Sequence, residues 1–187
     1  MKIIALISLL VLASCGAPNV QVQSTKAENT SLSPKNMVFV TTKDLGLNQS
    51  QYSSFYLYTL KYLSNCGIRT NAVILKSKSA DELKKITEAK NKFKPDSIMS
   101  IELSEQDGWT YSNRYGQNIG TDISEIKYLV TLADTANGKA VWKANLDLHP
   151  KSGNPAEAGT SLANAIIEKM KQDNLAPATC KPPTDVK

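Results

Sequence analysis

The sequence contains one histidine and three cysteines, so it offers little of what catalytic and metal sites are usually built from. His149 stands beside a proline at the end of an apolar alternation, which is typical of a surface turn. Neither Cys66 nor Cys180 has a second cysteine or a histidine at zinc-ligand spacing. A glycine-rich phosphate loop and a nucleophile elbow are both missing from the sequence. The sequence therefore predicts no enzyme, no catalytic residue, no metal and no cofactor.

The composition excludes several further classes of protein. Hydrophobic residues make up 41% of the chain and charged residues 21%, which is ordinary globular usage and not that of a disordered or fibrous protein. The formal net charge is +5, but the lysines are scattered and form no basic stripe. Because a nucleic-acid-binding protein usually concentrates its charge on one face, we expect no nucleic acid partner.

The first fourteen residues have the layout of a secretory signal peptide. Lys2 supplies a positive start, and residues 3–12 form an apolar run interrupted only by Ser8. The run is shorter than the ~20 residues that a membrane-spanning helix needs. Small residues follow it, as they do before a cleavage site. We expect residues 1–14 to be removed on export.

The end of this segment, Leu12-Ala13-Ser14-Cys15, resembles the lipobox of bacterial lipoproteins. The resemblance implies that the Cys15 thiol carries lipid, so that several acyl chains hold the protein on a membrane. Gly16 resembles the pattern sorted to the outer membrane, on its periplasmic side, in a Gram-negative host. The alternative is an ordinary cleaved signal followed by a chance cysteine.

The next segment, residues 16–35, is rich in polar residues and proline, and Val20, Val22 and Leu32 are its only sizeable apolar residues. Such a composition buries too little surface to offset chain entropy. We therefore expect a lipidated and flexible tether over residues 15–35, a folded domain over residues 36–176 and a tail over residues 177–187.

Within residues 36–176 the apolar pattern alternates between helical and extended periods. Strands are predicted over residues 37–40, 71–75, 97–105, 126–132 and 140–148, and helices over residues 49–66 and 80–93 and from Pro155 onward. Asn48 with Gln51 and Ser79 with Glu82 form capping boxes at two helix starts. On the strand 97–105, Glu102 and Glu105 should face opposite sides and so cannot act as an acid–base pair. The order β-α-β-α-β-β-β-α predicts an α/β (α+β) domain with a mixed sheet and helices packed on it.

The segment 134–142 contains an Asn137-Gly138 turn signal between two predicted strands. Its pattern, Asp134 followed by Gly138, Lys139 and Trp142, resembles a hairpin of periplasmic lipoproteins related in fold to the N-terminal domain of TolB and to the curli secretion lipoprotein. The resemblance implies the same α/β fold over about residues 36–175. It also implies work as a subunit or partner of an envelope assembly.

The connection over residues 107–120 is longer than the two to five residues usual for a hairpin. It contains Trp109, Tyr111, Arg114 and Tyr115, residue types enriched in recognition surfaces. One interpretation is a recognition loop. The other is that the two strands extend into this segment and the rings make cross-strand pairs.

Cys66 and Cys180 are the two cysteines that lipidation leaves over, in a compartment where disulfides persist. If the strands at residues 37–40 and 97–105 are parallel, the first and last helices end at the same end of the domain. The two thiols could then meet, and we expect a disulfide between them. The alternative is a buried Cys66 and a free Cys180.

Two functional hypotheses follow. The first is a lipid-anchored, non-enzymatic module that docks onto another envelope protein, through residues 107–120 or through the wet face of the hairpin sheet. The second is a module that binds a glycan such as peptidoglycan, or a small ligand, with Trp109, Tyr111 and Tyr115.

Overall fold

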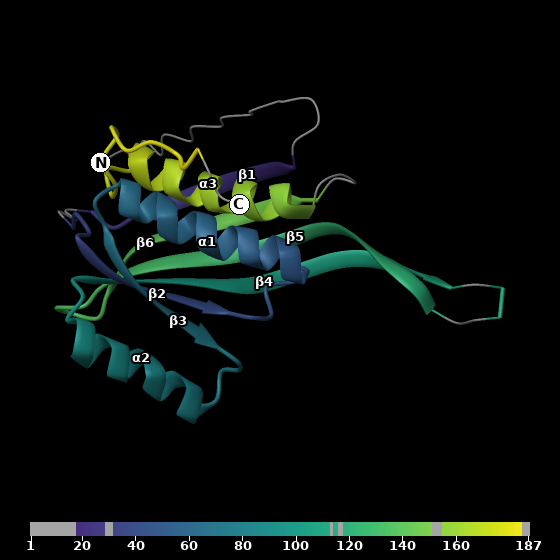
Figure 1. The fold of residues 1–187 in the computed structure, drawn as a ribbon, viewed down its shortest axis with the longest axis horizontal. Helices are drawn as coiled ribbons and strands as arrows, with labels where there is room; N and C mark the ends of the chain where they lie inside the picture. The colour runs from purple at the N-terminus through teal and green to yellow at the C-terminus, as the bar shows by residue number, and fades with distance from the viewer. Residues whose placement is uncertain (1–17, 29–31, 113, 116–117, 151–154, 185–187) are drawn as a thin grey trace, which may run out of the picture.

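The computed structural model describes residues 18–28, 32–112, 114–115, 118–150 and 155–184. Within them the chain forms a mixed six-stranded sheet and three helices, which confirms the predicted α/β class (Figure 1). The elements are β1 (Asn19–Lys26), β2 (Asn36–Thr42), α1 (Gln49–Asn65), β3 (Arg69–Leu75), α2 (Ala80–Phe93), β4 (Ser97–Ser112), β5 (Asn118–Asp134), β6 (Ala140–His149) and α3 (Pro155–Gln172).

The prediction of a tether without structure is wrong for Asn19–Lys26, because this segment forms the edge strand β1. It pairs antiparallel with β6 along its whole length, from Asn19 opposite His149 to Lys26 opposite Trp142. Val20 and Val22 pack against the core, while Gln21 between them and Gln23 after them are exposed. This alternation is a strand signal, although the polar composition of the segment favours a tether. Pairing with β6 supplies the stability that the segment lacks alone.

The sheet has the strand order β1-β6-β5-β4-β2-β3. β2 runs parallel to both β3 and β4, and the pairs β4–β5, β5–β6 and β6–β1 are antiparallel. The parallel pairing of β2 with β4, which the disulfide prediction required, is therefore present. The short turn at Gly138, which has a positive φ of 69°, joins β5 to β6 as the Asn-Gly signal predicted.

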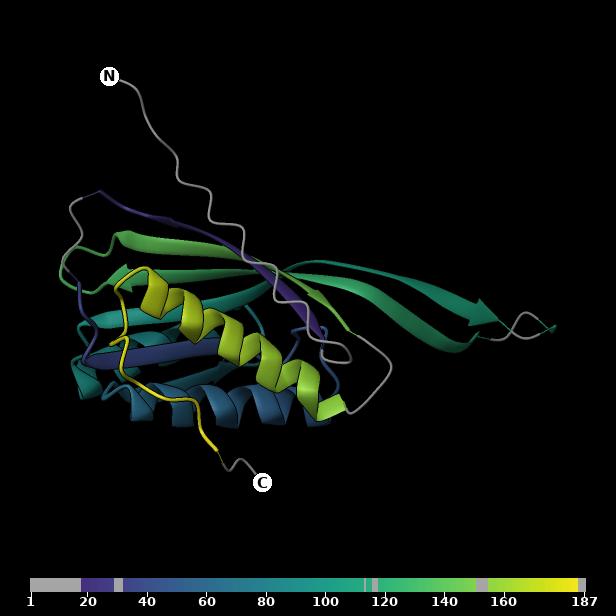
Figure 2. The same ribbon diagram turned by 90° about the horizontal axis from the view of Figure 1, so that it is seen from above.

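Helices cover the two faces of the sheet unequally. α1 and α3 lie side by side over one face and enclose the main core, which includes Phe39, Phe55, Tyr128 and Trp142 (Figures 1 and 2). On the opposite face, α2 contacts only β2 and β3 among the described elements, and a smaller cluster around Val38 lies between them. The opposite face of the other four strands therefore carries no helix among the described elements.

Local sequence signals set the ends of α1 as predicted. The Asn48 side chain accepts a hydrogen bond from the Gln51 backbone N–H, and the Gln51 side chain accepts one from the Asn48 backbone N–H, both at 2.9 Å. At the other end, Gly67 has a φ of 74° and the Ile68 N–H donates to the Leu63 carbonyl oxygen at 2.9 Å. A left-handed glycine followed by an apolar residue is a common helix stop.

The predicted disulfide between Cys66 and Cys180 is present, with 4.6 Å between the two Cα atoms. It holds the segment after α3 against the end of α1. Two further contacts fasten the same segment: the Asn65 side-chain amide donates to the Lys181 carbonyl oxygen, and the Lys171 ammonium donates to that of Cys180, both at 3.1 Å. Cys180 is only 7% exposed, so it belongs to the core although the sequence analysis assigned it to the tail.

Candidate functional site

The hairpin β4–β5 is the most protruding feature of the molecule (Figure 1). Its strands have 16 and 17 residues and pair with each other from Ser97–Asp134 to Ser112–Asn118. The neighbouring strands are shorter: β2 pairs with β4 only up to Ser100, and β6 pairs with β5 only from Ile126. Beyond Ser100 on β4 and before Ile126 on β5, no described strand flanks the hairpin. We call the outer part, residues 108–112 and 118–123 with the turn that joins them, the arm.

The predicted recognition residues are all in the arm, but not on a long loop. Trp109 lies in β4 opposite Asp122, and Tyr111 lies opposite Gly120. The prediction of a loop is wrong here, and the alternative of extended strands is confirmed for the backbone. The structure describes the backbone of Trp109 and Tyr111 but not their side chains. The predicted cross-strand ring pairs therefore stay a prediction.

Arg114 and Tyr115 lie at the turn of the arm, and both are exposed. Tyr115 is 75% exposed, the highest value among the large hydrophobic side chains described. The Arg114 guanidinium carbon lies 5.2 Å from the centre of the Tyr115 ring, within the range of a cation–π contact. The arm thus presents a cation and an aromatic ring together at its tip.

A cluster of charges surrounds the base of the arm. The Lys127 ammonium lies 2.8 Å from a Glu105 carboxylate oxygen and 3.5 Å from one of Glu125, and the Glu105 contact raises the lysine pKa. His149 Nε2 lies 3.8 Å from the Glu125 carboxylate. The fold thus brings the histidine near a carboxylate of a strand that is distant in sequence.

Glu102 and Glu105 lie on the same face of the sheet, which corrects the prediction that they face opposite sides. A register shift between Leu103 and Glu105 adds a residue to β4, so that both glutamates fall on the face of Lys127. Each carboxylate is bound by its own lysine, Lys78 for Glu102 and Lys127 for Glu105. Two separate ion pairs do not form an acid–base pair.

The face of β5, β6 and β1 that lies away from α1 and α3 is the second candidate surface. We call it the open sheet face, and it is lined by Gln21, Gln23, Thr25, Lys127, Leu129, Thr131, Lys143, Asn145 and Asp147. These side chains alternate with the core residues of the same strands, as expected for an antiparallel sheet with one wet face. Their donors and acceptors form rows across three paired strands.

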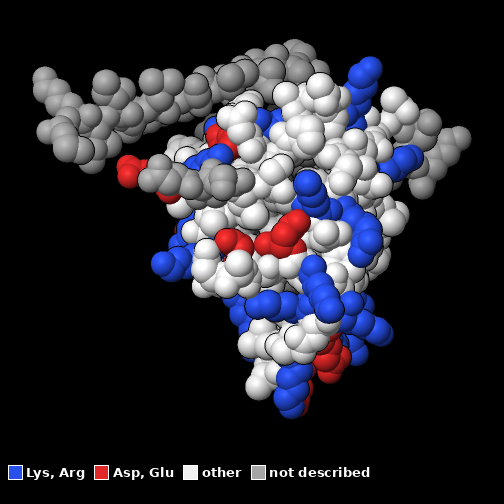
Figure 3. Space-filling view, turned by 90° about the vertical axis from the view of Figure 1, so that its left-hand side faces the viewer, with Lys and Arg blue, Asp and Glu red and all other residues white. Residues whose placement is uncertain are grey.

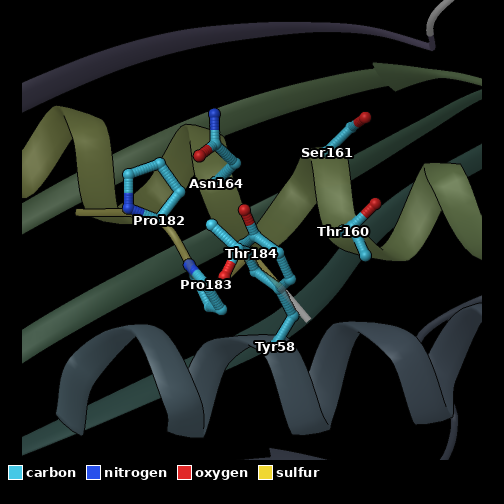
Figure 4. A pocket seen from close by; sticks show the side chains of 7 residues that line it. All are labelled: Tyr58, Thr160, Ser161, Asn164, Pro182, Pro183 and Thr184. Atoms are coloured by element: carbon cyan, nitrogen blue, oxygen red, sulfur yellow. The ribbon is translucent and has the colours of Figure 1, made fainter. Parts of the chain in front are cut away.

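A shallow hollow of about 430 Å³ lies between α1, α3 and the C-terminal segment (Figure 4). Tyr58 rises into it from α1, and Pro182 and Pro183 form the wall contributed by the C-terminal segment. The remaining lining residues are Thr160, Ser161, Asn164 and Thr184. The lining contains no carboxylate, imidazole, amine or thiol, and its one titratable group is the Tyr58 hydroxyl, whose pKa is raised by burial.

The end of the sheet opposite the arm is basic. Figure 3 shows lysine and arginine side chains gathered over the lower part of this end, where α2 lies. Lys35, Arg69 and Lys94 are exposed there. The nearby Asp96 carboxylate already accepts hydrogen bonds from the Lys35 and Asn36 backbone N–H groups, at 2.9 and 3.0 Å. One carboxylate beside three exposed cations neutralises this surface only in part.

Among the described residues, no group of histidine, cysteine, aspartate and glutamate side chains is arranged to hold a metal ion. No helix in the described part of the chain is both long and apolar enough to cross a membrane. Cys15 and the predicted signal peptide lie outside the described residues.

Comparison with known proteins shows a likeness of fold and no sequence family. No family model matches the chain, and no curated protein matches it. Among solved structures, a PelC variant crystallised as a dodecamer, from Paraburkholderia phytofirmans, is 16% identical with a TM-score of 0.50. The match covers 79% of this chain and 95% of that one. At this identity the likeness shows that the two chains share an α/β fold.

Two other solved structures are less similar. A PDZ domain protein from Parabacteroides distasonis is 12% identical with a TM-score of 0.42, over 89% of this chain and 38% of that chain. A Xanthomonas campestris protein of the family model DUF330 is 10% identical with a TM-score of 0.38, over 76% of this chain and 89% of that chain.

Proposed function

We propose that this protein is a lipid-anchored, non-enzymatic module of the cell envelope that docks onto another envelope protein. The anchor is Cys15, on the periplasmic side of the outer membrane of a Gram-negative host. The observation that carries the docking role is the open sheet face. The lipobox resemblance at residues 12–15 supports the anchor.

The open sheet face has polar groups that the protein itself leaves available. Gln21, Gln23, Lys143 and Asn145 are exposed, and their side chains make no hydrogen bond or ion pair with any described residue. On the exposed face of α2 the charged groups are already engaged, because Lys84 is paired with Asp81 and Lys85 with Glu82. Docking on the sheet face therefore breaks no internal bond of these four side chains, and it gains hydrogen bonds to a rigid surface.

The likeness to PelC supports an assembly role in general terms. The PelC chain was crystallised as a dodecamer, so a chain of this fold serves there as the subunit of an assembly. The partner of the present chain would accordingly be a protein surface and not a diffusing substrate.

Cross-linking in intact cells tests the docking role. Lys143→Glu combined with Asn145→Arg changes the charge and size of two exposed side chains in the centre of the open sheet face. The matched control is Lys84→Glu with Asn91→Arg on the exposed side of α2. We expect one specific protein partner to be lost from the first variant and retained in the control.

The same experiment separates the docking role from glycan binding. A partner that is captured equally well after glycan-digesting treatment supports docking onto a protein. Retention of the pure domain on isolated cell wall, abolished by Trp109→Ala with Tyr115→Ala, would instead establish the glycan hypothesis. No described contact favours a glycan at the arm.

The anchor has its own test. Wild-type protein grown with a clickable fatty acid should take up the label, and Cys15→Ala should remain unlabelled and leave the membrane fraction or stay unprocessed. A wild-type chain without label would contradict the lipoprotein assignment.

A further inference from the structure

β1 places the predicted lipid anchor close to one particular end of the domain. Its first residue, Asn19, lies opposite His149, and His149 approaches Glu125 at the base of the arm. Only residues 16–18 separate Asn19 from Cys15. At most about 3.6 Å per residue, four steps along the chain span roughly 14 Å. β6 lies between β1 and β5, and two strand spacings of about 4.8 Å add roughly 10 Å, so the base of the arm lies within about 24 Å of Cys15.

The arm starts from the same end of the sheet. From Asp107, which pairs with Glu125, β4 continues for five residues to its last residue, Ser112. At about 3.4 Å per residue, this part of β4 spans roughly 17 Å. The arm is thus longer than the link between Asn19 and Cys15. A membrane that holds Cys15 lies within reach of the arm tip.

The composition of the arm tip suits a membrane–water interface. Trp109, Tyr111 and Tyr115 fall within a few residues of one another, and Arg114 adds a positive charge. The stretch from Gly108 to Thr121 contains no aspartate or glutamate that anionic head groups would repel. Tryptophan and tyrosine concentrate at the level of lipid head groups, where a ring can be buried while its polar atom stays wet.

We infer that the arm is a membrane-contacting element: its tip lies among the lipid head groups of the membrane that holds Cys15, so the domain stands with its arm end toward the lipid and its basic end away. The inference rests on the proposed lipid anchor. It also fits the docking role, because the open sheet face then stands at an angle to the membrane and is accessible from its side. The lipid contact would prevent rotation about a single flexible link.

The two tryptophans of the chain allow a direct measurement. Trp142 is buried and its indole N–H donates to Asp173 at 2.7 Å, whereas Trp109 is in the arm. Trp142→Phe leaves Trp109 as the single tryptophan, which is excited apart from the tyrosines. The matched control carries Trp142→Phe, Trp109→Phe and Lys139→Trp, which moves the fluorophore to the exposed turn at the opposite end of the sheet. Thermal unfolding of both variants first confirms that each is folded.

The full lipidated chain is reconstituted into vesicles of phosphatidylethanolamine and phosphatidylglycerol that contain lipids brominated near the head group. We expect the Trp109 fluorophore to lose most of its emission to the bromine and the control fluorophore to lose none. Equal quenching in both variants, or no quenching of Trp109, would overturn the inference. If a labelled fatty acid shows the chain to be lipidated, only the orientation fails; if the chain carries no lipid, the anchor and the orientation fail together.

Discussion

Single residues decide how closely the helices of this fold approach each other, and Gly159 is the clearest case. A Cβ at this position would lie 2.0 Å from the Gln51 carbonyl oxygen and 2.8 Å from the Phe55 backbone nitrogen. Both atoms belong to the backbone of α1, which cannot move as a flexible side chain does. The glycine therefore permits the contact of α3 with α1, and nothing in the local pattern of the sequence indicated it.

Gly159→Ala should destabilise the protein by about 1–3 kcal/mol through overpacking. Helix propensity alone would favour alanine by about 1 kcal/mol, so the two effects predict opposite signs. The measurement is the free energy of unfolding in urea. Ser161→Ala on the same helix is the control and should stay within about 0.5 kcal/mol of wild type. A more stable Gly159→Ala protein would show that the two helices are not in close contact.

Buried tyrosines make stability depend on alkaline pH. The Tyr128 hydroxyl donates to the Leu45 carbonyl oxygen at 3.0 Å, and burial raises its pKa above the ordinary value of 10.0. Burial, followed by the hydrogen bond to Glu168, likewise raises the pKa of Tyr62. Above pH 10.0 the unfolded chain loses these protons while the folded chain keeps them. Stability is therefore complete below that pH and falls as the pH rises toward the folded values.

Tyr128→Phe should lower the free energy of unfolding at neutral pH by about 1 kcal/mol, because the hydrogen bond to Leu45 is lost. Above pH 10.0 the same variant should lose stability less steeply than wild type, since one buried ionisable group is gone. Urea titrations at a series of pH values measure both effects. A slope equal to that of wild type would mean that Tyr128 ionises in the folded protein as it does in water.

At the scale of elements, the sequence predicted what depends on local signals and missed what depends on pairing. The capping residues Asn48 and Ser79 and the glycine after α1 are local, so those helix ends were found. β1 is stabilised by pairing with β6, which is distant in sequence, and its polar composition led to the prediction of a tether although Val20 and Val22 alternate with polar residues. For residues 107–120 the sequence left a loop and extended strands as alternatives, and the pairing of β4 with β5 decides for the strands.

The packing of β1 on the core can be tested by substitution. Val22→Asp places a carboxylate where Val22 packs against the core, and we expect a loss of about 1–3 kcal/mol. Gln23→Asp, at the next position of the same strand, points to solvent opposite Asn145 and should change stability by less than about 0.5 kcal/mol. Urea unfolding of the two variants compares them directly. Equal free energies of unfolding for the two variants would show that residues 19–26 do not pack on the domain and form a tether.

At the scale of the whole molecule, long-range topology could be predicted where chain direction alone determined it. The parallel pairing of β2 with β4 brings the ends of α1 and α3 to the same end of the domain, and Cys66 meets Cys180 there. The inferred orientation on a membrane could not be predicted from the sequence, because it depends on β1. With the proposed lipid on Cys15, a strand beginning four residues later would determine which end of the sheet lies near the membrane.

The disulfide between Cys66 and Cys180 closes a long loop of the fold. The bridge joins residues separated by 114 positions, and closing such a loop adds about 4–5 kcal/mol by chain entropy, less any strain. Cys66→Ser with Cys180→Ser should therefore unfold at a lower urea concentration than wild type and release the wall of the hollow formed by Pro182 and Pro183. A maleimide added to the denatured, unreduced mature protein should modify neither cysteine. Modification of both would show that the thiols are free, and the stability of the double variant should then match that of wild type.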